Sequence, residues 1–190
     1  MVDVPRDLIK QAAGGDLSAF EQMYHLTSGF VYSVALRISR NNADAEEVTQ
    51  DVFLQIYRNL KNFKFASSFT TWAYRIATNT AINKYRQASR ERSHLQGYEQ
   101  EAIRQPGKDT TAEYINQESA QKTVAALLDR LDPEQRACIV LREIEGLSYK
   151  EMAEVLQINI NTVRTRLKRA REALLESASE GAIRHGLQKH

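Results

Sequence analysis

The sequence predicts an all-α protein with two small helical domains joined by a flexible linker. Apolar residues recur at helical spacing along most of the chain, and no segment shows the period-two alternation that strands require. The segment 89–117 is polar, contains a Pro-Gly pair and has few large apolar side chains. Because it buries too little surface to offset the entropy of ordering, we expect a mobile linker there. The domains then span 1–88 and 118–177, and a tail at 178–190, which lacks periodicity, is expected to fray.

Composition and charge indicate a globular protein. The chain has 190 residues, of which 42% are hydrophobic, and a formal net charge of +2. This charge is too small for a histone-like binder, so any contact with nucleic acid must come from local patches. No apolar run approaches the roughly 20 residues that span a bilayer, and the N-terminus MVDVPRDLIK carries acids where a signal peptide needs basic residues. We therefore expect a cytoplasmic protein without direct membrane insertion.

Metal and disulfide chemistry find little support in the sequence. Cys138 is the only cysteine, which excludes an internal disulfide. His25, His94, His185 and His190 are scattered and offer no metal-ligand spacing. We expect no metal and no cofactor, and we expect Cys138 to be a small core residue, since free cysteine behaves as a buried hydrophobe.

In the first domain, the segment 44–58, DAEEVTQDVFLQIYR, predicts an amphipathic helix. Its apolar face consists of Val48, Val52 and Ile56, with Phe53 beside them. Acids are concentrated at its start, where they complement the positive end of the helix dipole. A contact with a partner explains the same acids equally well, and the residues alone leave both explanations open.

The segment 62–86 predicts a loop followed by a helix in which aromatic residues alternate with cations. Aromatic faces stack on bases pulled from a duplex, and cations hold the released backbone. Packing into the core is the alternative role, and we favour it for Trp72 and Ile76, which lie four residues apart. Polar side chains that can pair with base edges or hold phosphates share one helical face or lie next to it: Asn79, Asn83, Lys84 and Arg86.

In the second domain, capping signals predict where two helices begin. Asp132 followed by Pro133 is typical of a helix start, because proline is favoured at the first helical position after a capping acid. Ser148-Tyr-Lys-Glu151 matches a capping box, in which the serine and the glutamate satisfy each other's backbone N–H groups. That helix is expected to stop near residue 157, and Asn159 can cap the next one.

The next helix, over 162–172, carries a concentration of positive charge. Val163, Leu167 and Ala170 form one apolar stripe, five cations flank it, and no acid appears before Glu172. Solvated helical faces usually alternate charge signs, so an anionic partner is the leading explanation. Two short helices joined by a tight turn, the second carrying the cations, predict a helix-turn-helix whose second helix enters the major groove of DNA.

Four segments of the second domain resemble region 4 of bacterial RNA polymerase sigma factors, in particular the small extracytoplasmic-function (ECF) group. They are LDPEQRA at 131–137, the stretch ending in LRE at 141–143, EGLSYKEMA at 145–153 and NTVRTRL at 161–167. The segment 62–86 resembles sigma region 2. The additional regions of the larger sigma factors have no counterpart in the chain, which assigns it to the small group.

The resemblance implies a transcription initiation factor that is not an enzyme. Such a protein would bind core RNA polymerase, at the clamp of the largest subunit and the flap of the second-largest subunit. It would recognise the minus-35 element of promoter DNA through region 4 and the minus-10 element through region 2, where it would open the duplex. The resemblance also implies an anti-sigma protein as a partner.

The resemblance also implies roles for individual residues. The residues implied to bind the minus-35 element are polar residues of the basic helix: Arg164, Thr165, Arg166, Lys168, Arg169 and Arg171. Minus-10 recognition and melting fall to residues of the aromatic loop and its helix: Phe63, Lys64, Phe65, Phe69, Trp72, Asn79, Asn83, Lys84 and Arg86. Polymerase binding falls to three exposed residues of the acidic helix: Glu47, Gln50 and Asp51.

Two further expectations concern surfaces. The extruded base would occupy a pocket made by the loop from Phe63 to Phe69 together with Asn79. The flap would contact an apolar surface around three residues of region 4: Leu131, Cys138 and Leu141. Within region 4, we expect Arg166 and Arg171 to contact phosphates, which set register without reading sequence.

The sequence departs from the family at two places and leaves one rival function open. Gln157 replaces the glycine that often follows the first helix of the helix-turn-helix, and Lys64-Phe65-Ala66 replaces small or acidic loop residues. A two-domain helix-turn-helix regulator that acts without melting DNA is the alternative function. An enzyme is disfavoured, because the sequence has no Gly-rich phosphate loop, no HExxH and no recognisable nucleophile with its base.

Overall fold

The protein is described by a computed structural model that covers residues 4–95 and 124–187, with side chains for 4–91 and 124–177. Every regular element in these ranges is helical, and no strand occurs in them, so the predicted all-α class is confirmed. The predicted linker from residue 96 onward lies outside the described residues. None of the described helices is long and apolar enough to cross a membrane.

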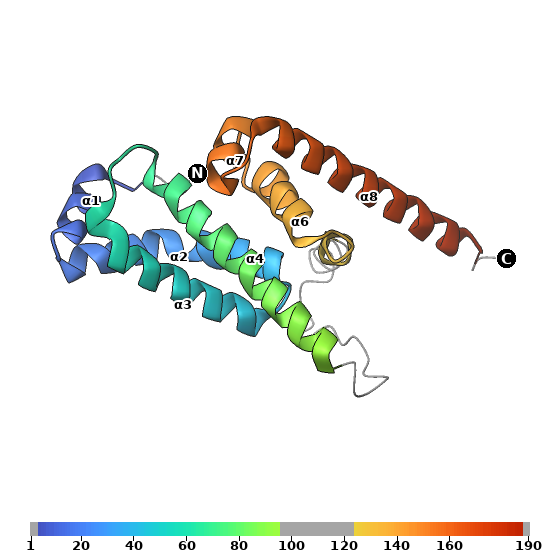
Figure 1. Cartoon of the computed structure of the whole chain (residues 1–190), viewed down its shortest axis with the longest axis horizontal. Helices are drawn as coiled ribbons and strands as arrows, with labels where there is room; N and C mark the ends of the chain where they lie inside the picture. The colour runs from blue at the N-terminus through green and yellow to red at the C-terminus, as the bar shows by residue number, and fades with distance from the viewer. Residues whose placement is uncertain (1–3, 96–123, 188–190) are drawn as a thin grey trace.

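The N-terminal domain is a helical bundle of α1 (Arg6–Ala13), α2 (Leu17–Ser39), α3 (Asn42–Asn59) and α4 (Phe69–Leu95). Helices α2, α3 and α4 pack on one another, and the short helix η1 (Leu60–Asn62) leads from α3 into the loop before α4 (Figure 1). The predicted apolar face of α3 is buried, since Val48, Val52, Ile56 and Phe53 are all at most 7% exposed.

Side-chain caps set where the bundle helices begin. The carboxylate of Asp16 accepts a hydrogen bond from the backbone N–H of Ala19 at the start of α2. The Asn41 side chain accepts one from the N–H of Asp44 at the start of α3. These bonds satisfy backbone donors that have no partner inside the helix. At the other end of α2, Arg40 adopts a left-handed conformation that reverses the chain into α3.

The C-terminal domain contains α6 (Pro133–Ile139), η2 (Val140–Ile144), α7 (Tyr149–Leu156) and α8 (Ile160–Leu187). The predicted caps are confirmed: Asp132 caps α6 with Pro133 in its first turn, and both halves of the Ser148–Glu151 capping box are formed at α7. η2 is a π-helical segment that continues α6, and no sequence signal predicted it.

Two elements extend beyond their predicted ends. α4 continues to Leu95, past the expected domain boundary at residue 88, and α8 continues to Leu187 through the tail that was expected to fray. Fraying of the tail itself stays a prediction. Extending an existing helix avoids the cost of nucleation, so a helix can continue without an amphipathic stripe.

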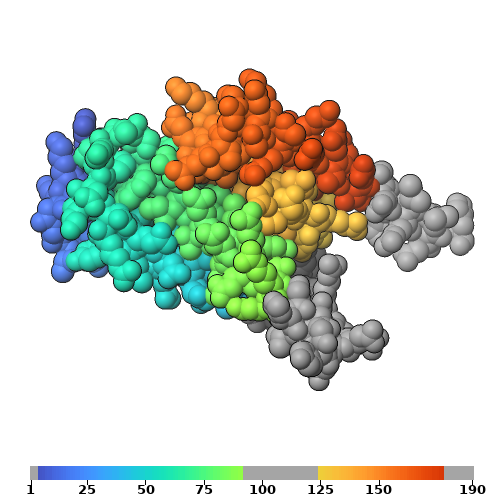
Figure 2. All heavy atoms as spheres, viewed as in Figure 1, coloured from blue at the N-terminus to red at the C-terminus, as the bar shows by residue number. Residues whose placement is uncertain are grey.

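The two domains pack against each other. Helices α6 and α7 contact α4, and α6 also contacts α2, while α8 lies along the outer side of the C-terminal domain (Figures 1 and 2). The sequence predicted two bodies and a linker but gave no indication of this contact.

The packing corrects one expectation about surfaces. Leu131, Cys138 and Leu141 are at most 3% exposed, so they form no apolar surface in this structure. Their side chains belong to the hydrophobic core instead. Burial also raises the pKa of the Cys138 thiol to about 11, which keeps it protonated and confirms the prediction of a core cysteine.

Candidate nucleic-acid and polymerase surfaces

The helix-turn-helix presents a row of polar side chains on α8. Val163, Leu167 and Ala170 are at most 1% exposed, so the predicted apolar stripe is confirmed and fixes which face of the helix points outward. Asn159 precedes α8 and caps it, because its side-chain oxygen accepts a hydrogen bond from the Asn161 N–H at 2.8 Å. Four of the residues expected to read the minus-35 element are exposed on this outer face: Arg164, Thr165, Lys168 and Arg169.

The other two cations of α8 lie at the edges of this face. Arg166 is half-buried, and its charge lies near the Cys138 thiol. Arg171 is exposed and donates a hydrogen bond to Glu143 of η2 at 2.7 Å, which raises the pKa of its guanidinium. These positions agree with the expectation that both residues point to the sides of the helix. Arg171, however, already has an acidic partner within the domain.

The aromatic residues of the loop before α4 form one cluster. Phe63 stacks on Trp72 with ring centroids 5.0 Å apart, and Phe65 lies 4.9 Å from Phe63. Phe69 meets Trp72 edge-on at 5.8 Å and is 4% exposed. Phe69 is therefore a core residue, whereas Phe63, Phe65 and Trp72 remain partly exposed.

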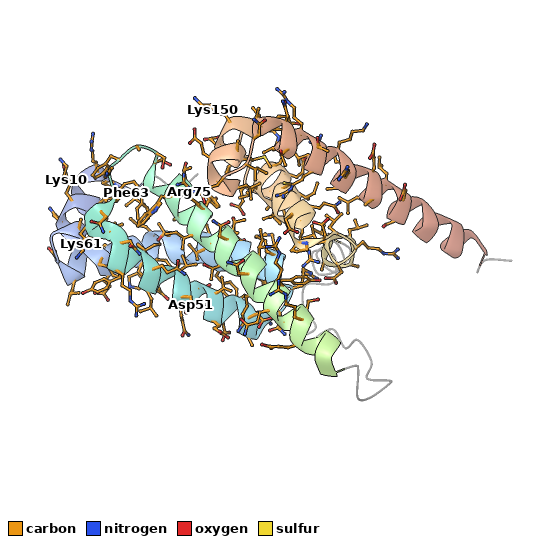
Figure 3. The ribbon with its side chains drawn as sticks, in the orientation of Figure 1. Lys10, Asp51, Lys61, Phe63, Arg75 and Lys150 are labelled. Atoms are coloured by element: carbon orange, nitrogen blue, oxygen red, sulfur yellow. The ribbon has the colours of Figure 1, made fainter. Side chains whose placement is uncertain are left out.

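A pocket of about 600 Å³ opens beside this cluster. Phe63 and Trp72 give it an aromatic wall, and its lining includes polar or charged residues from three helices and the loop: Gln55, Asn59, Lys64, Arg75 and, from α7, Glu154. Figure 3 shows Phe63 and Arg75 near each other at the start of α4. Asn79 does not line this pocket, which corrects the expectation that it would form one wall. The reason is helical geometry, since Asn79 lies a full turn beyond Arg75 along α4.

The remaining polar residues of α4 lie further along the helix. Asn83 and Arg86 line a second, smaller groove with Arg90. Lys84 does not share that groove. Its ammonium group donates to the carboxylate of Glu47 at 2.6 Å, and this hydrogen bond raises the pKa of Lys84.

The acidic face of α3 is open. Glu47, Gln50 and Asp51 are all exposed, and Figure 3 shows Asp51 on the side of α3 away from the C-terminal domain. The helix dipole acts mainly within the first turn, which in α3 contains Asp44. The helix dipole therefore does not explain why the residues at positions 47 and 51 are acidic.

Sequence reasoning missed several polar residues of the pocket, among them Gln55, Asn59 and Arg75. Gln55 and Asn59 lie on α3, and Arg75 lies on α4 with a buried Nε that has no hydrogen-bond partner among the described residues. A signal for Arg75 existed, because it lies three residues after Trp72 and thus on the same helical face. Gln55 and Asn59 come from another helix, so only the packing of α3 on α4 brings them to the pocket.

These features define a helix-turn-helix protein with a second helical domain that carries an aromatic pocket. Two family models match the chain: "Sigma-70 region 2" at residues 23–91 and "Sigma-70, region 4" at residues 121–174. The chain belongs to the ECF group of RNA polymerase sigma factors. Members of this family are transcription initiation factors and not enzymes.

Curated relatives support this assignment over most of the chain. The ECF RNA polymerase sigma-E factor of Escherichia coli is 34% identical over 176 residues, with 88% of this chain and 90% of that protein covered. The RNA polymerase sigma-H factor of Pseudomonas aeruginosa is 32% identical, with 89% and 91% covered. SigE of Mycolicibacterium smegmatis is 35% identical, with 85% of this chain covered, and the alignment spans 63% of that relative's length.

Two solved structures have the same fold. CnrH in complex with the cytosolic domain of CnrY matches with a TM-score of 0.68 and 27% identity, covering 92% of this chain and 97% of that one. The sigma factor RpoE from Bartonella quintana, in complex with the anti-sigma factor NepR, matches with a TM-score of 0.62 and 25% identity, covering 83% and 94%.

Proposed function

We propose that the chain directs core RNA polymerase to promoters by binding the minus-35 element through α8 and the minus-10 element through the loop before α4. The linker between the two domains, expected near residues 89–117, lets both elements be bound at once. Tethering makes the second contact effectively intramolecular, so two modest interfaces together give high promoter selectivity. The protein acts in the bacterial cytoplasm, where the polymerase works.

The chemistry of α8 supports its part in this proposal. Arg164, Lys168 and Arg169 project from the exposed face, where arginine and lysine bond guanine edges or phosphates. Thr165 offers a hydroxyl and a methyl group, although its hydroxyl also donates to the Asn161 carbonyl at 2.9 Å.

The observation that carries the proposal is the aromatic pocket, whose aromatic wall belongs to the N-terminal domain. A helix-turn-helix alone suits a regulator that never melts DNA, whereas an initiation factor needs a place for a base removed from the duplex. Unstacking a base costs a few kcal/mol, so a preformed pocket favours melting without ATP. Phe63 and Trp72 supply stacking faces, and Lys64 and Arg75 supply charge for the backbone.

Partner surfaces belong to the same proposal. Glu47, Gln50 and Asp51 form an exposed face that suits the largest-subunit clamp, and region 4 would meet the flap of the second-largest subunit. The flap contact cannot use the buried Leu131, Cys138 and Leu141 in the present arrangement. An anti-sigma partner is supported by the RpoE structure, which contains the anti-sigma factor NepR.

Permanganate reactivity of promoter thymines tests the proposal. Core polymerase with this protein should make thymines at the minus-10 element reactive, and core polymerase alone should not. Phe63→Leu keeps apolar volume but loses the stacking face, which is worth about 1–3 kcal/mol per base, so reactivity should fall at least fivefold. Phe20→Leu is the matched control, because Phe20 is partly buried on α2 outside the pocket. Binding without any reactive thymine would favour the regulator that does not melt DNA.

A further inference from the structure

We infer that Arg6 of α1 is a positioning residue for the aromatic pocket, because its guanidinium holds the loop before α4 through the ring of Phe65. The inference rests on the proposed function, since that function gives the pocket a base to hold. Arg6 itself does not line the pocket. It acts through Phe65 and Phe63 on the aromatic wall against which the base stacks.

The loop between η1 and α4 is held at both ends. At its start, the Phe63 N–H donates to the carbonyl of Leu60 in η1 at 3.0 Å. At its end, the Ser68 hydroxyl accepts a hydrogen bond from the N–H of Thr71 in α4 at 3.0 Å. Between these ends, the residues on either side of Phe65 are exposed, whereas Phe65 is half-buried. Phe65 is therefore the residue through which the middle of the loop is held.

Phe65 has a backbone conformation that needs support. Its φ of 54° lies in the left-handed region, where a bulky residue is an outlier. A residue keeps such a conformation only when its surroundings over-determine it, and residues of this kind cluster at functional sites. Its ring lies 4.9 Å from that of Phe63, and the Arg6 guanidinium lies 4.6 Å from its centroid. Phe63 belongs to the same loop, so of these two contacts it is the one with Arg6 that ties Phe65 to a separate element.

Helix α1 gives Arg6 a fixed base. Ile9 and Ala12 of this helix are buried, and α1 packs on α2 and lies beside η1 (Figure 1). Arg6 is the first residue of α1, at the positive end of the helix dipole, which disfavours a cation. An aromatic face attracts a guanidinium group, so the contact with Phe65 offsets this cost. The contact therefore stabilises both Arg6 in its position and Phe65 in its conformation.

The path from Arg6 to the pocket is short. The ring of Phe65 packs against Phe63, which stacks on Trp72 with ring centroids 5.0 Å apart and an angle of 29° between the planes. Phe63 and Trp72 line the pocket, and so does Lys64, which lies between the two phenylalanines in the sequence. A movement of Phe65 would therefore displace a stacking face and a positive charge together.

Loss of Arg6 should lower the fraction of molecules in which the loop can accept a base. The apparent affinity for a ligand falls in proportion to the fraction of the protein in the binding-competent state. Arg6 is exposed, and a cation–π contact at an exposed site is worth about two- to fivefold in an equilibrium constant. The part of the affinity that depends on the base should fall by this factor, and the part that comes from the DNA backbone should not change.

Single-stranded oligonucleotides with the non-template minus-10 sequence test this on the complex of core polymerase with the full-length chain. One oligonucleotide is intact. The other has an abasic nucleotide at the position where this change weakens binding by the unmodified chain most. Arg6→Ala should weaken binding of the intact oligonucleotide about two- to fivefold and leave the affinity for the abasic one unchanged. Fluorescence anisotropy measures both affinities.

Three further variants extend the test. Arg6→Lys should retain more affinity for the intact oligonucleotide than Arg6→Ala, because an ammonium group also binds a ring face. Adding Arg6→Ala to Phe65→Leu should cause no further loss, because the ring that Arg6 contacts is already absent. Lys10→Ala is the control. Lys10 is a 61% exposed cation on the same helix that pairs with Asp7, so its removal should change neither affinity.

The outcomes separate the positioning role from other roles of Arg6. Equal weakening of both oligonucleotides by Arg6→Ala would indicate a direct contact with the DNA backbone or a general loss of structure, and it overturns the inference. An unchanged affinity for the intact oligonucleotide, equal losses in Arg6→Lys and Arg6→Ala, or a further loss in the double variant also overturns it. These outcomes leave the base pocket itself intact. If no abasic nucleotide weakens binding by the unmodified chain, the proposed base pocket fails, and the positioning role fails with it.

Discussion

Gln157 is the residue at which the helix-turn-helix departs most clearly from an unstrained backbone. Its φ of 54° is left-handed, and its N–H caps α7 by donating to the Ala153 carbonyl. The left-handed region costs an L-residue roughly 1–2 kcal/mol, and glycine avoids this cost. The side chain is exposed, so little packing compensates for the strain.

Gln157→Gly should therefore stabilise region 4. The gain is about 0.5–1 kcal/mol, because relief of the strain exceeds the extra entropy that glycine has in the unfolded chain. Urea denaturation followed by circular dichroism measures it. Glu154→Gly, at an exposed position inside α7, is the matched control and should cost about 1 kcal/mol. Loss of stability in both variants would contradict a strained Gln157.

Gln157 and Phe65, two of the residues with a left-handed backbone, differ in how far the sequence could predict them. Gln157 stands where related chains often have glycine, so the position itself indicated an unusual backbone. Phe65 also has a φ of 54°, yet an aromatic residue gives no hint of it. Its conformation is held by tertiary contacts, since its ring lies under the Arg6 guanidinium at 4.6 Å and against Phe63. The contact with Arg6 comes from a distant segment, so local sequence patterns do not predict it.

At the scale of the element, the start of α7 shows how a local motif fixes a helix. The Ser148 N–H donates to the Glu151 carboxylate at 2.7 Å, and the Ser148 hydroxyl accepts from the Glu151 N–H. The hydrogen bonds from Ser148 lower the pKa of Glu151. Every group in this motif lies within four residues, which is why the sequence predicted it in full.

The capping box should make the stability of region 4 depend on pH. A lowered folded pKa means that Glu151 contributes stability above its unfolded pKa, near 4.3, and that this contribution is lost as pH falls through the folded pKa. Glu151→Ala should cost about 0.5–1 kcal/mol at pH 7 and clearly less at pH 3. Urea denaturation at both pH values checks this. An equal cost at both would show that the carboxylate charge plays no part.

The basic helix α8 was predicted well on its buried side and less well on its exposed side. Periodicity alone identified Val163, Leu167 and Ala170, since burial of a helix follows its apolar stripe. Neighbouring elements decide which cations can contact DNA, because an acid on such an element can pair with a cation of α8. Glu143 of η2 pairs with Arg171, and no sequence pattern predicts that these two residues meet.

Salt dependence should separate the cations of α8 by role. Lys168→Ala should weaken promoter binding by the polymerase complex for every sequence and lower the slope of log K against log salt by about 1, as expected for one lost phosphate contact. Arg164→Ala should instead relax base preference at one minus-35 position, at a cost of about 1–3 kcal/mol. Filter binding across salt concentrations measures both. Lys10→Ala on α1 is the charge-matched control and should change neither.

At the scale of the whole molecule, the contact between the domains was beyond what the sequence could predict. Arg136 is a charged residue in the first turns of α6, yet it is buried and donates to a carbonyl 98 residues away in the sequence. Hydrophobic periodicity predicts the buried face of each helix. It does not predict which exposed faces of the two domains contact each other. The side chain that joins the domains is charged, so no apolar stripe marks it.

The same contact should govern how the molecule unfolds. Buried residues of both domains belong to one hydrophobic cluster, so the chain should unfold in a single calorimetric transition. Asp129→Arg removes only the partly exposed pair with Arg40 and leaves this cluster untouched, so it should lower the transition temperature slightly without dividing the transition. Arg40→Asp combined with it should restore the original transition temperature. Two transitions in the unmodified chain would mean that the domains unfold independently, because the contact between them would then be too weak to couple their unfolding.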